Sequence, residues 1–118
     1  QRDAFSATST GAGLKALNIP LLSETRDIIV NAPEIAENGA KVDIEISSNL
    51  PNTRSLLLFA DKNPLPLCAE LEFGDNALPY AKIQIKLAES MRIRAVARTA
   101  DGKNHVAFRD IKVTLSGC

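Results

Sequence analysis

The sequence has little of the material from which catalytic sites and nucleic-acid interfaces are built. In 118 residues it has one histidine, two cysteines, no tryptophan, one tyrosine and four phenylalanines. The 14 basic residues are balanced by 14 acidic ones, so no net charge attracts nucleic acid or an anionic membrane. So few aromatic side chains provide no platform on which bases could stack. We therefore expect no nucleic-acid partner.

Long hydrophobic runs are missing as well. The longest are about the length of "LLLFA" (56–60), whereas a membrane-spanning helix needs about 20 apolar residues. The N-terminus "QRDAFSATSTGAG" lacks the apolar centre of a secretory signal, which fits either a cytoplasmic protein or a mature, already cleaved one. The sequence thus predicts a soluble protein, and two cysteines are too few for a disulfide scaffold.

Familiar catalytic and cofactor motifs are absent too. His105 follows the Asp101-Gly102 turn, and a surface histidine beside a turn explains it better than a Ser-His-Asp triad. A zinc site would need more cysteine and histidine at closer spacing. The "STGAG" stretch (9–13) follows no strand and is a weak match to a phosphate-binding loop. We expect no metal and no cofactor.

A two-residue period fills most of the chain after residue 24. Seven segments alternate apolar and polar residues or run continuously apolar, as half-buried or central strands do; they lie near 28–30, 42–46, 54–61, 67–73, 83–87, 93–97 and 106–115. Seven short strands predict an all-β fold, an immunoglobulin-like antiparallel β-sandwich at 25–115. Residues 1–24 form an N-terminal segment with a short helix, for which Thr10 is the expected N-cap.

Turn residues separate the predicted strands. The pairs Asn38-Gly39 and Asp101-Gly102 favour tight reversals of the chain. In the last segment Val106 and Phe108 follow one phase and Ile111 the other, and the slip at 109–110 predicts a β-bulge.

Cys68 interrupts the apolar set of its strand. Leu67 and Ala69 alternate with it, so Cys68 is expected to face the other way, with Glu70 and Glu72. One interpretation is a thiol that faces a partner, for example in an intermolecular disulfide. The other is a partly covered small residue with no special role.

Cys118 is the most informative residue. It is the last residue given, and the small residues Ser116 and Gly117 precede it, so 116–118 are expected to form a flexible arm. Nothing local lowers the thiol pKa, and a neighbouring terminal carboxylate would raise it, so activation would come from a partner's site. The alternatives are a chain end without chemistry and a disulfide bridge from Cys68 to Cys118 that closes the domain.

Several stretches together resemble the SoxY family, the sulfur-carrying subunits of bacterial thiosulfate oxidation. The resemblance covers almost the whole chain; its stretches are "AFSATSTGAGLKAL", "NAPEIAENGAKVDIEISSNLP", "LLLFADKNPLPL", "MRIRAVARTADGK" and "IKVTLSGC". The family arm ends Gly-Gly-Cys-Gly-Gly. Here Ser116 replaces the first glycine, Gly117 and Cys118 match, and no residue follows, which bears on the length of the arm.

The resemblance implies a periplasmic substrate carrier rather than an enzyme. It would pair with SoxZ, and thiosulfate would be joined oxidatively to Cys118 by the c-type cytochrome SoxAX. SoxB would then release sulfate by hydrolysis, and SoxCD would in some organisms oxidise the remaining sulfane. Cys68 would lie at the SoxZ interface or join two carriers.

Two other functions compete with a covalent sulfur carrier. One is a β-sandwich interaction module in which Cys118 has no chemistry or forms a disulfide. The other is a small thiol enzyme that uses Cys118 with His105, although no supporting acid or pocket motif accompanies them.

Overall fold

The computed structural model of the chain describes residues 2–114. Two short helices precede nine strands in this part of the chain, and all seven predicted strands are present. The elements are α1 (Arg2–Ser6), α2 (Thr10–Ala16), β1 (Ser23–Glu24), β2 (Ile28–Asn31), β3 (Ile35–Ala36), β4 (Val42–Ser48), β5 (Thr53–Ala60), β6 (Leu67–Glu72), β7 (Tyr80–Ile85), β8 (Met91–Thr99) and β9 (Asn104–Val113).

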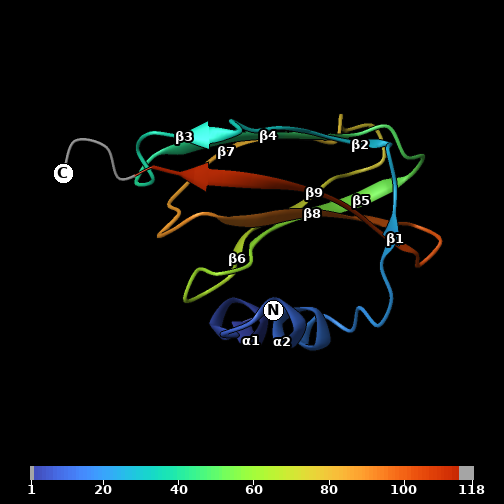
Figure 1. Ribbon diagram of the computed structural model, residues 1–118. Helices are drawn as coiled ribbons and strands as arrows, with labels where there is room; N and C mark the ends of the chain where they lie inside the picture. The colour runs from blue at the N-terminus through green and yellow to red at the C-terminus, as the bar shows by residue number, and fades with distance from the viewer. Residues whose placement is uncertain (1, 115–118) are drawn as a thin grey trace.

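The strands form two sheets, which confirms the predicted β-sandwich. The larger sheet has the order β1-β9-β8-β5-β6, with β3 also paired to β9, and the smaller has the order β2-β4-β7. All seven predicted strands pair antiparallel, whereas the two-residue strands β1 and β3 pair parallel with β9. Figure 1 shows α1 and α2 against the outer face of the larger sheet, so that the molecule has three layers.

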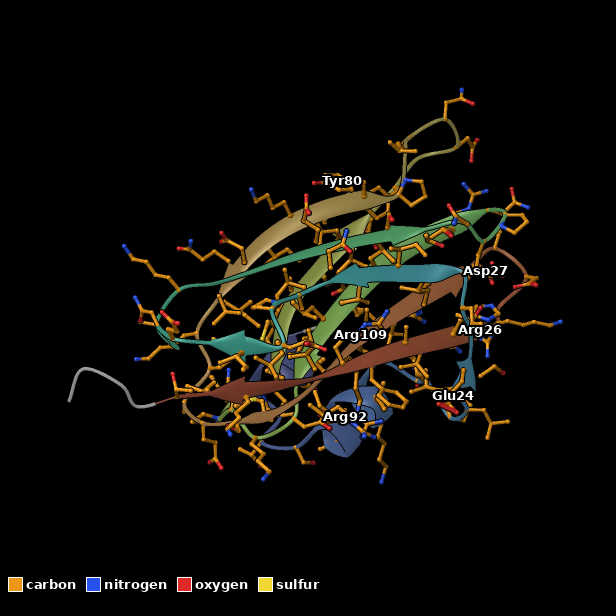
Figure 2. The ribbon with its side chains drawn as sticks, turned by 45° about the horizontal axis from the view of Figure 1, so that its top comes forward. Glu24, Arg26, Asp27, Tyr80, Arg92 and Arg109 are labelled. Atoms are coloured by element: carbon orange, nitrogen blue, oxygen red, sulfur yellow. The ribbon has the colours of Figure 1, made fainter. Side chains whose placement is uncertain are left out.

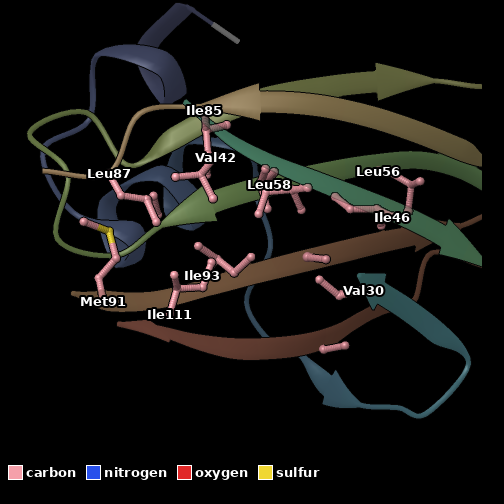
Figure 3. Packing of buried hydrophobic residues seen from close by; sticks show 14 of the residues in the cluster. Val30, Val42, Ile46, Leu56, Leu58, Ile85, Leu87, Met91, Ile93 and Ile111 are labelled. Atoms are coloured by element: carbon pink, nitrogen blue, oxygen red, sulfur yellow. The ribbon is translucent and has the colours of Figure 1, made fainter. Parts of the chain in front are cut away.

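The main hydrophobic core lies between the two sheets (Figure 3). It is made of aliphatic side chains from the inner faces of the strands, which alternate with outward polar residues as the two-residue period predicts. They include Ile28, Val30, Val42, Ile44, Ile46, Leu56, Leu58, Ile85, Met91, Ile93 and Ile111.

A second, smaller core lies between the larger sheet and the helices. Its members are Ala4, Leu17, Ile19, Leu57, Phe59, Leu67, Val96 and Val106. In β5, Leu56 and Leu58 enter the first core while Leu57 and Phe59 enter the second. The continuous apolar run of this strand is therefore explained by burial on both faces, as predicted.

This second core also shows why the predicted bulge at 109–110 is wrong. The β8–β9 ladder runs without a register shift from the Met91–Ile111 pair to the Arg98–Asn104 pair. Val106 points to the helices and Ile111 to the other sheet, so each is buried on a different face of one regular strand. The apparent change of phase reflects two covered faces.

Both predicted reversals are present as turns, but only one of them closes a hairpin. Asp101-Gly102 joins β8 to β9 as a hairpin, with Gly102 at a φ of 84° and the Thr99 N–H donating to the Lys103 carbonyl at 3.1 Å. Asn38-Gly39 forms no hairpin, because β3 pairs with β9 while β4 pairs with β2 and β7. This turn instead takes the chain from one sheet to the other.

The predicted N-cap is displaced by one residue. Ser9 caps α2, its hydroxyl accepting the Ala12 N–H at 3.0 Å, and Thr10 is the first helical residue. Thr10 instead donates through its hydroxyl to Asp61 at 2.8 Å, on the loop after β5. This contact helps to fix the helical layer on the sheet.

Candidate functional site

The last strand of the sandwich is held on both edges up to the end of the described chain. On one edge β9 pairs antiparallel with β8 through the Met91–Ile111 pair. On the other it pairs parallel with β3, where the Lys112 N–H donates to the Glu34 carbonyl at 2.9 Å and the Thr114 N–H to the Ala36 carbonyl at 3.0 Å. The chain is therefore fixed in the fold as far as Thr114, at the end of β9 next to β3 (Figure 1).

Two further contacts hold this end of β9. The Ser90 hydroxyl accepts the Val113 N–H at 2.8 Å and lies 3.4 Å from the Val113 carbonyl. Gly39 lies so close that an added Cβ would be 2.5 Å from the Leu87 carbonyl oxygen and 3.1 Å from Val113 Cγ1. The Asn38-Gly39 turn is thus packed against the anchored end.

The predicted attachment residue and its arm, Ser116, Gly117 and Cys118, lie outside the described residues 2–114. The anchor at Thr114 still limits where Cys118 can go. Four residue steps span at most about 14 Å when fully extended. Cys118 can therefore act only near this end of the sandwich.

A groove of about 370 Å³ lies beside the anchored end. Its lining includes Lys62 and Lys112 as well as Glu34 and Asp110, so neither sign of charge dominates. Arg92 lies in the same groove and on the outer face of β8 (Figure 2), where it pairs with Asp110 at 2.8 Å and stacks over the Phe108 ring at 4.0 Å. The Arg92 guanidinium lowers the pKa of the Asp110 carboxyl, which stays ionised.

The prediction that Cys68 points away from the core is wrong. The register of β5 and β6 shifts between Leu58 and Phe59, which leaves Cys68 as the extra residue of a bulge. It is half-buried, packs against the main core together with Ala69, and donates weakly through Sγ to the Pro66 carbonyl at 3.4 Å. Burial raises the pKa of the Cys68 thiol, which keeps it protonated and poorly nucleophilic at neutral pH.

His105 is half-buried at the start of β9. Its Nε2 lies 3.3 Å from the Thr99 hydroxyl, which also donates to Asp101 at 2.5 Å. That hydrogen bond lowers the pKa of the exposed Asp101 carboxyl. The Thr99 hydroxyl therefore lies between the Asp101 carboxylate and the His105 imidazole. This differs from a catalytic triad, in which the carboxylate orients the histidine directly.

The position of His105 also argues against a thiol enzyme. His105 and Thr114 are nine residue steps apart, and the residues between them all belong to β9, so about 30 Å separates the two at the usual rise per residue. That is about twice the reach of the chain from Thr114 to Cys118. The two residues cannot meet within one molecule.

A bridge from Cys68 to Cys118 meets a similar obstacle. Cys68 lies three strands away from β9, at the level of Phe108, so about 14 Å across the sheet and 20 Å along it separate Cys68 from Thr114. The diagonal of about 25 Å exceeds the arm's reach even with the Cα spacing of a disulfide added.

Two further expectations concern metal and membrane. Among residues 2–114, no three histidine, cysteine, aspartate or glutamate side chains lie close enough together to hold a metal ion. No helix within these residues combines the length and the apolar character that crossing a membrane requires.

Comparison with known proteins shows to which family the chain belongs. The family model described as "Sulfur oxidation protein SoxY" matches residues 16–118, which is most of the chain. The chain belongs to the SoxY family. A search of curated protein sequences finds no match to this SoxY-family chain.

Solved structures agree with that assignment. The sulfur carrier protein SoxY from Chlorobium limicola f thiosulfatophilum is 28% identical, with a TM-score of 0.82 over 93% of this chain and 96% of that one. A superoxide reductase (neelaredoxin) from Ignicoccus hospitalis is 19% identical, with a TM-score of 0.64 over 76% and 82% of the two chains. A putative superoxide reductase from Thermotoga maritima, also 19% identical, has a TM-score of 0.67 over 79% and 94%. The superoxide reductases share the fold alone.

Sequence reasoning missed the residues that anchor the end of β9. Ala36 and Ser90 make their contacts through backbone or hydroxyl groups that carry no periodic signal. The Asn-Gly pair predicts the turn at Gly39, but it does not predict the close approach of Gly39 to Leu87.

Proposed function

We propose that this SoxY-family protein carries sulfur intermediates covalently on the thiol of Cys118. The observation that supports the proposal most is the anchoring of β9 up to Thr114, four residues before Cys118. A carrier needs a rigid folded domain that partner enzymes recognise and a thiol that extends away from this domain. The other thiol, on Cys68, is half-buried and has a raised pKa, so it competes poorly for an electrophile.

The chemistry of loading follows from the substrate. The Cys118 thiolate and the sulfane sulfur of thiosulfate form a disulfide-type S–S bond, and two electrons leave to an oxidant, which we propose is the c-type cytochrome SoxAX. The product is a cysteine S-thiosulfonate. Attack of water on its sulfonate sulfur, which we assign to SoxB, releases sulfate and two protons and leaves a persulfide anion on Cys118.

The proposal includes the setting in which the carrier works. We propose that the protein pairs with SoxZ in the periplasm, visits SoxAX and SoxB in turn, and in some organisms presents the persulfide to SoxCD. The chain itself supplies the attachment point, with Ser116 and Gly117 as the arm, and the partner enzymes supply the catalysis. The carrier needs no cofactor beyond the sulfur it holds.

Intact-mass spectrometry tests the proposal directly. Protein from cells oxidising thiosulfate is expected to carry a reducible sulfur adduct that maps to the C-terminal peptide. Cys118→Ser should abolish both the adduct and thiosulfate-dependent activity of a reconstituted system while leaving the unfolding curve unchanged. Activity retained by this variant would reject the carrier assignment.

An interaction module without thiol chemistry is the alternative. It predicts an unmodified Cys118 under the same growth conditions. For Cys68 we keep the proposal of an interface position or an intermolecular disulfide. A cross-linked band on non-reducing electrophoresis that disappears in Cys68→Ala would support it, and its absence would count against it.

A further inference from the structure

Asn38 is the only asparagine in the sequence that glycine follows. The other asparagines are at positions 18, 31, 49, 52, 63, 76 and 104, and each precedes a residue with a side chain. The backbone nitrogen of the next residue can attack the side-chain amide of an asparagine, and the side chain of that residue hinders its approach. Glycine has no side chain, so Asn38 has the neighbour that hinders this attack least.

The Asn38-Gly39 turn, between β3 and β4, leaves the two nitrogens of this reaction free. Asn38 is exposed, and its backbone carbonyl accepts the Lys41 N–H at 3.2 Å, which closes the turn. Its side-chain Oδ1 accepts the Ala40 N–H at 3.0 Å. Among residues 2–114, nothing accepts a hydrogen bond from the Gly39 N–H or the Asn38 Nδ2. The attacking nitrogen and the leaving group are therefore unrestrained, while the side-chain carbonyl that is attacked is held in place.

The Ala40 N–H lies where it assists the attack. When the Gly39 nitrogen bonds to Asn38 Cγ, negative charge develops on Oδ1, which is the atom that accepts the Ala40 N–H. A donor that is already held at such an oxygen stabilises the transition state, because no reorganisation is needed as the charge forms. The folded turn thus provides a donor that an unfolded chain does not hold in place.

We propose that Asn38 is a site of deamidation, promoted by its turn, and that the product loosens the anchored end of β9. The Gly39 nitrogen bonds to Asn38 Cγ, and its proton leaves with the side-chain NH2 group as ammonia. Water then opens the resulting succinimide at one of its two carbonyls. One opening gives aspartate, and the other gives isoaspartate, in which the backbone runs through Cβ and Cγ of residue 38. The reaction needs no oxidant and no cofactor.

Isoaspartate lengthens the backbone at a turn that has no room for it. The Gly39 carbonyl accepts the Leu87 N–H at 2.7 Å, and an added Cβ on Gly39 would lie 2.5 Å from the Leu87 carbonyl oxygen and 3.1 Å from Val113 Cγ1. An extra backbone carbon next to Gly39 therefore displaces one of these close contacts. Since the turn lies beside the end of β9 (Figure 1), we expect the displacement to reach this strand through Val113.

The Asp101-Gly102 turn of the same fold is protected from the equivalent reaction. The Gly102 N–H donates to the Thr99 carbonyl at 3.0 Å, so the attacking nitrogen is occupied. The Asp101 carboxyl accepts the Thr99 hydroxyl and the Lys103 N–H, which lower its pKa and keep it ionised, a form that resists attack. This turn is an internal control for the effect of an adjacent glycine alone.

Peptide mapping of the full chain tests the first half of the proposal. During incubation in reducing, mildly alkaline buffer, residue 38 should deamidate at least about tenfold faster than any other asparagine, because glycine hinders the attack least. Mass spectrometry detects the exchange of NH2 for OH, and labelling by protein-isoaspartate methyltransferase identifies isoaspartate. Asp101 should remain unlabelled. Asn38→Ser should abolish the label and keep the turn, since a serine hydroxyl can accept the Ala40 N–H.

The same assay separates the turn from its sequence. In guanidinium the chain unfolds and the Ala40 N–H is no longer held at Oδ1, so residue 38 should react more slowly than in the folded chain. Faster reaction of the unfolded chain would overturn the role of the turn.

Hydrogen exchange tests the second half. In the purified isoaspartate form, the backbone amides of Lys112 and Val113 should exchange at least about tenfold faster than in fresh protein, whereas those of β5 should not change. Asn38→Asp is the matched control, because it adds the charge without the extra backbone carbon and should keep the protection of Val113.

Two further results would overturn the proposal. One is deamidation of residue 38 no faster than that of the other asparagines, and the other is full protection of Val113 in the isoaspartate form. Neither result bears on the carrier role of Cys118, because sulfur loading is measured on fresh protein and does not depend on residue 38.

Discussion

At the scale of single residues, Gly39 sets how tightly the end of β9 is packed. Its carbonyl accepts the Leu87 N–H at 2.7 Å, and a Cβ has no room between Leu87 and Val113. We expect Gly39→Ala to lower the free energy of unfolding by about 1 to 3 kcal/mol, the usual cost of overpacking. Urea denaturation measures this change in the free energy of unfolding. Gly74→Ala is the control, since nothing lies within 4 Å of a Cβ there, and an equal loss in both variants would contradict the packing argument.

Cys68 should be a slow nucleophile. In Cys118→Ser, where it is the remaining thiol, alkylation by iodoacetamide should become fast only at a higher pH than in the urea-unfolded chain, because burial raises its pKa. The folded chain holds this proton more tightly than the unfolded one, so stability should fall as pH rises through the alkaline range. The same alkylation midpoint in both states would show that burial does not control the thiol.

At the scale of elements, an ion pair joins the helical layer to the sheet. Arg94 on β8 contacts both carboxylate oxygens of Asp61, at 3.1 and 2.9 Å, and Asp61 also accepts from Thr10 of α2. Both side chains of the pair are largely shielded, 32% and 22% exposed.

We expect Asp61→Asn to lower stability by about 1 to 3 kcal/mol, since hydrogen bonds to charged groups are the stronger ones. Trypsin should also cleave faster at Lys15 because α2 loosens. Arg54→Ala removes a pair with Asp75 whose side chains are 44% and 81% exposed, and should cost less than about 1 kcal/mol. Equal losses in chemical denaturation would argue that burial of the Asp61 pair is unimportant.

The elements also show what the sequence could predict. Alternation located all seven long strands, because side-chain direction in a strand depends only on local parity. Parity does not show which face of a strand is covered. The switch from Val106 to Ile111 therefore resembles a bulge in the sequence, although helices cover one face of the strand and a sheet covers the other. At Cys68 the opposite error arose, since the real bulge depends on the register with β5. The pairing of β3 with β9 is long-range and left no local pattern.

The candidate site also has a part that the sequence predicts and a part that only the structure shows. Residue chemistry alone predicts that the Cys118 thiol is accessible, and the family resemblance predicts that it is the attachment point; both predictions concern a residue outside the described residues 2–114. The anchoring by Glu34, Ala36 and Ser90 required three-dimensional information, because these residues are distant in sequence from Thr114.

At the scale of the whole molecule, the two ends of β9 are far apart. His105 is at one end and Thr114 is just beyond the other, and four residue steps from Thr114 do not reach back to His105. We therefore expect His105→Ala to leave the sulfur loading of Cys118 unchanged, as measured by intact mass after reconstitution with thiosulfate. A large loss of loading without a loss of folding would mean that the histidine takes part, and the geometry given above would need another explanation.

The double anchoring of β9 has a mechanical consequence. A pull on the chain at Thr114 that runs along the axis of β9 loads its hydrogen bonds to β8 and β3 in shear, because both of these strands are aligned with β9. Hydrogen bonds perpendicular to such a load must break together in shear, whereas a peeled strand loses them one at a time. The sandwich should therefore resist unravelling from this end, a property that the proposed carrier role would use each time a partner enzyme held the chain beyond Thr114.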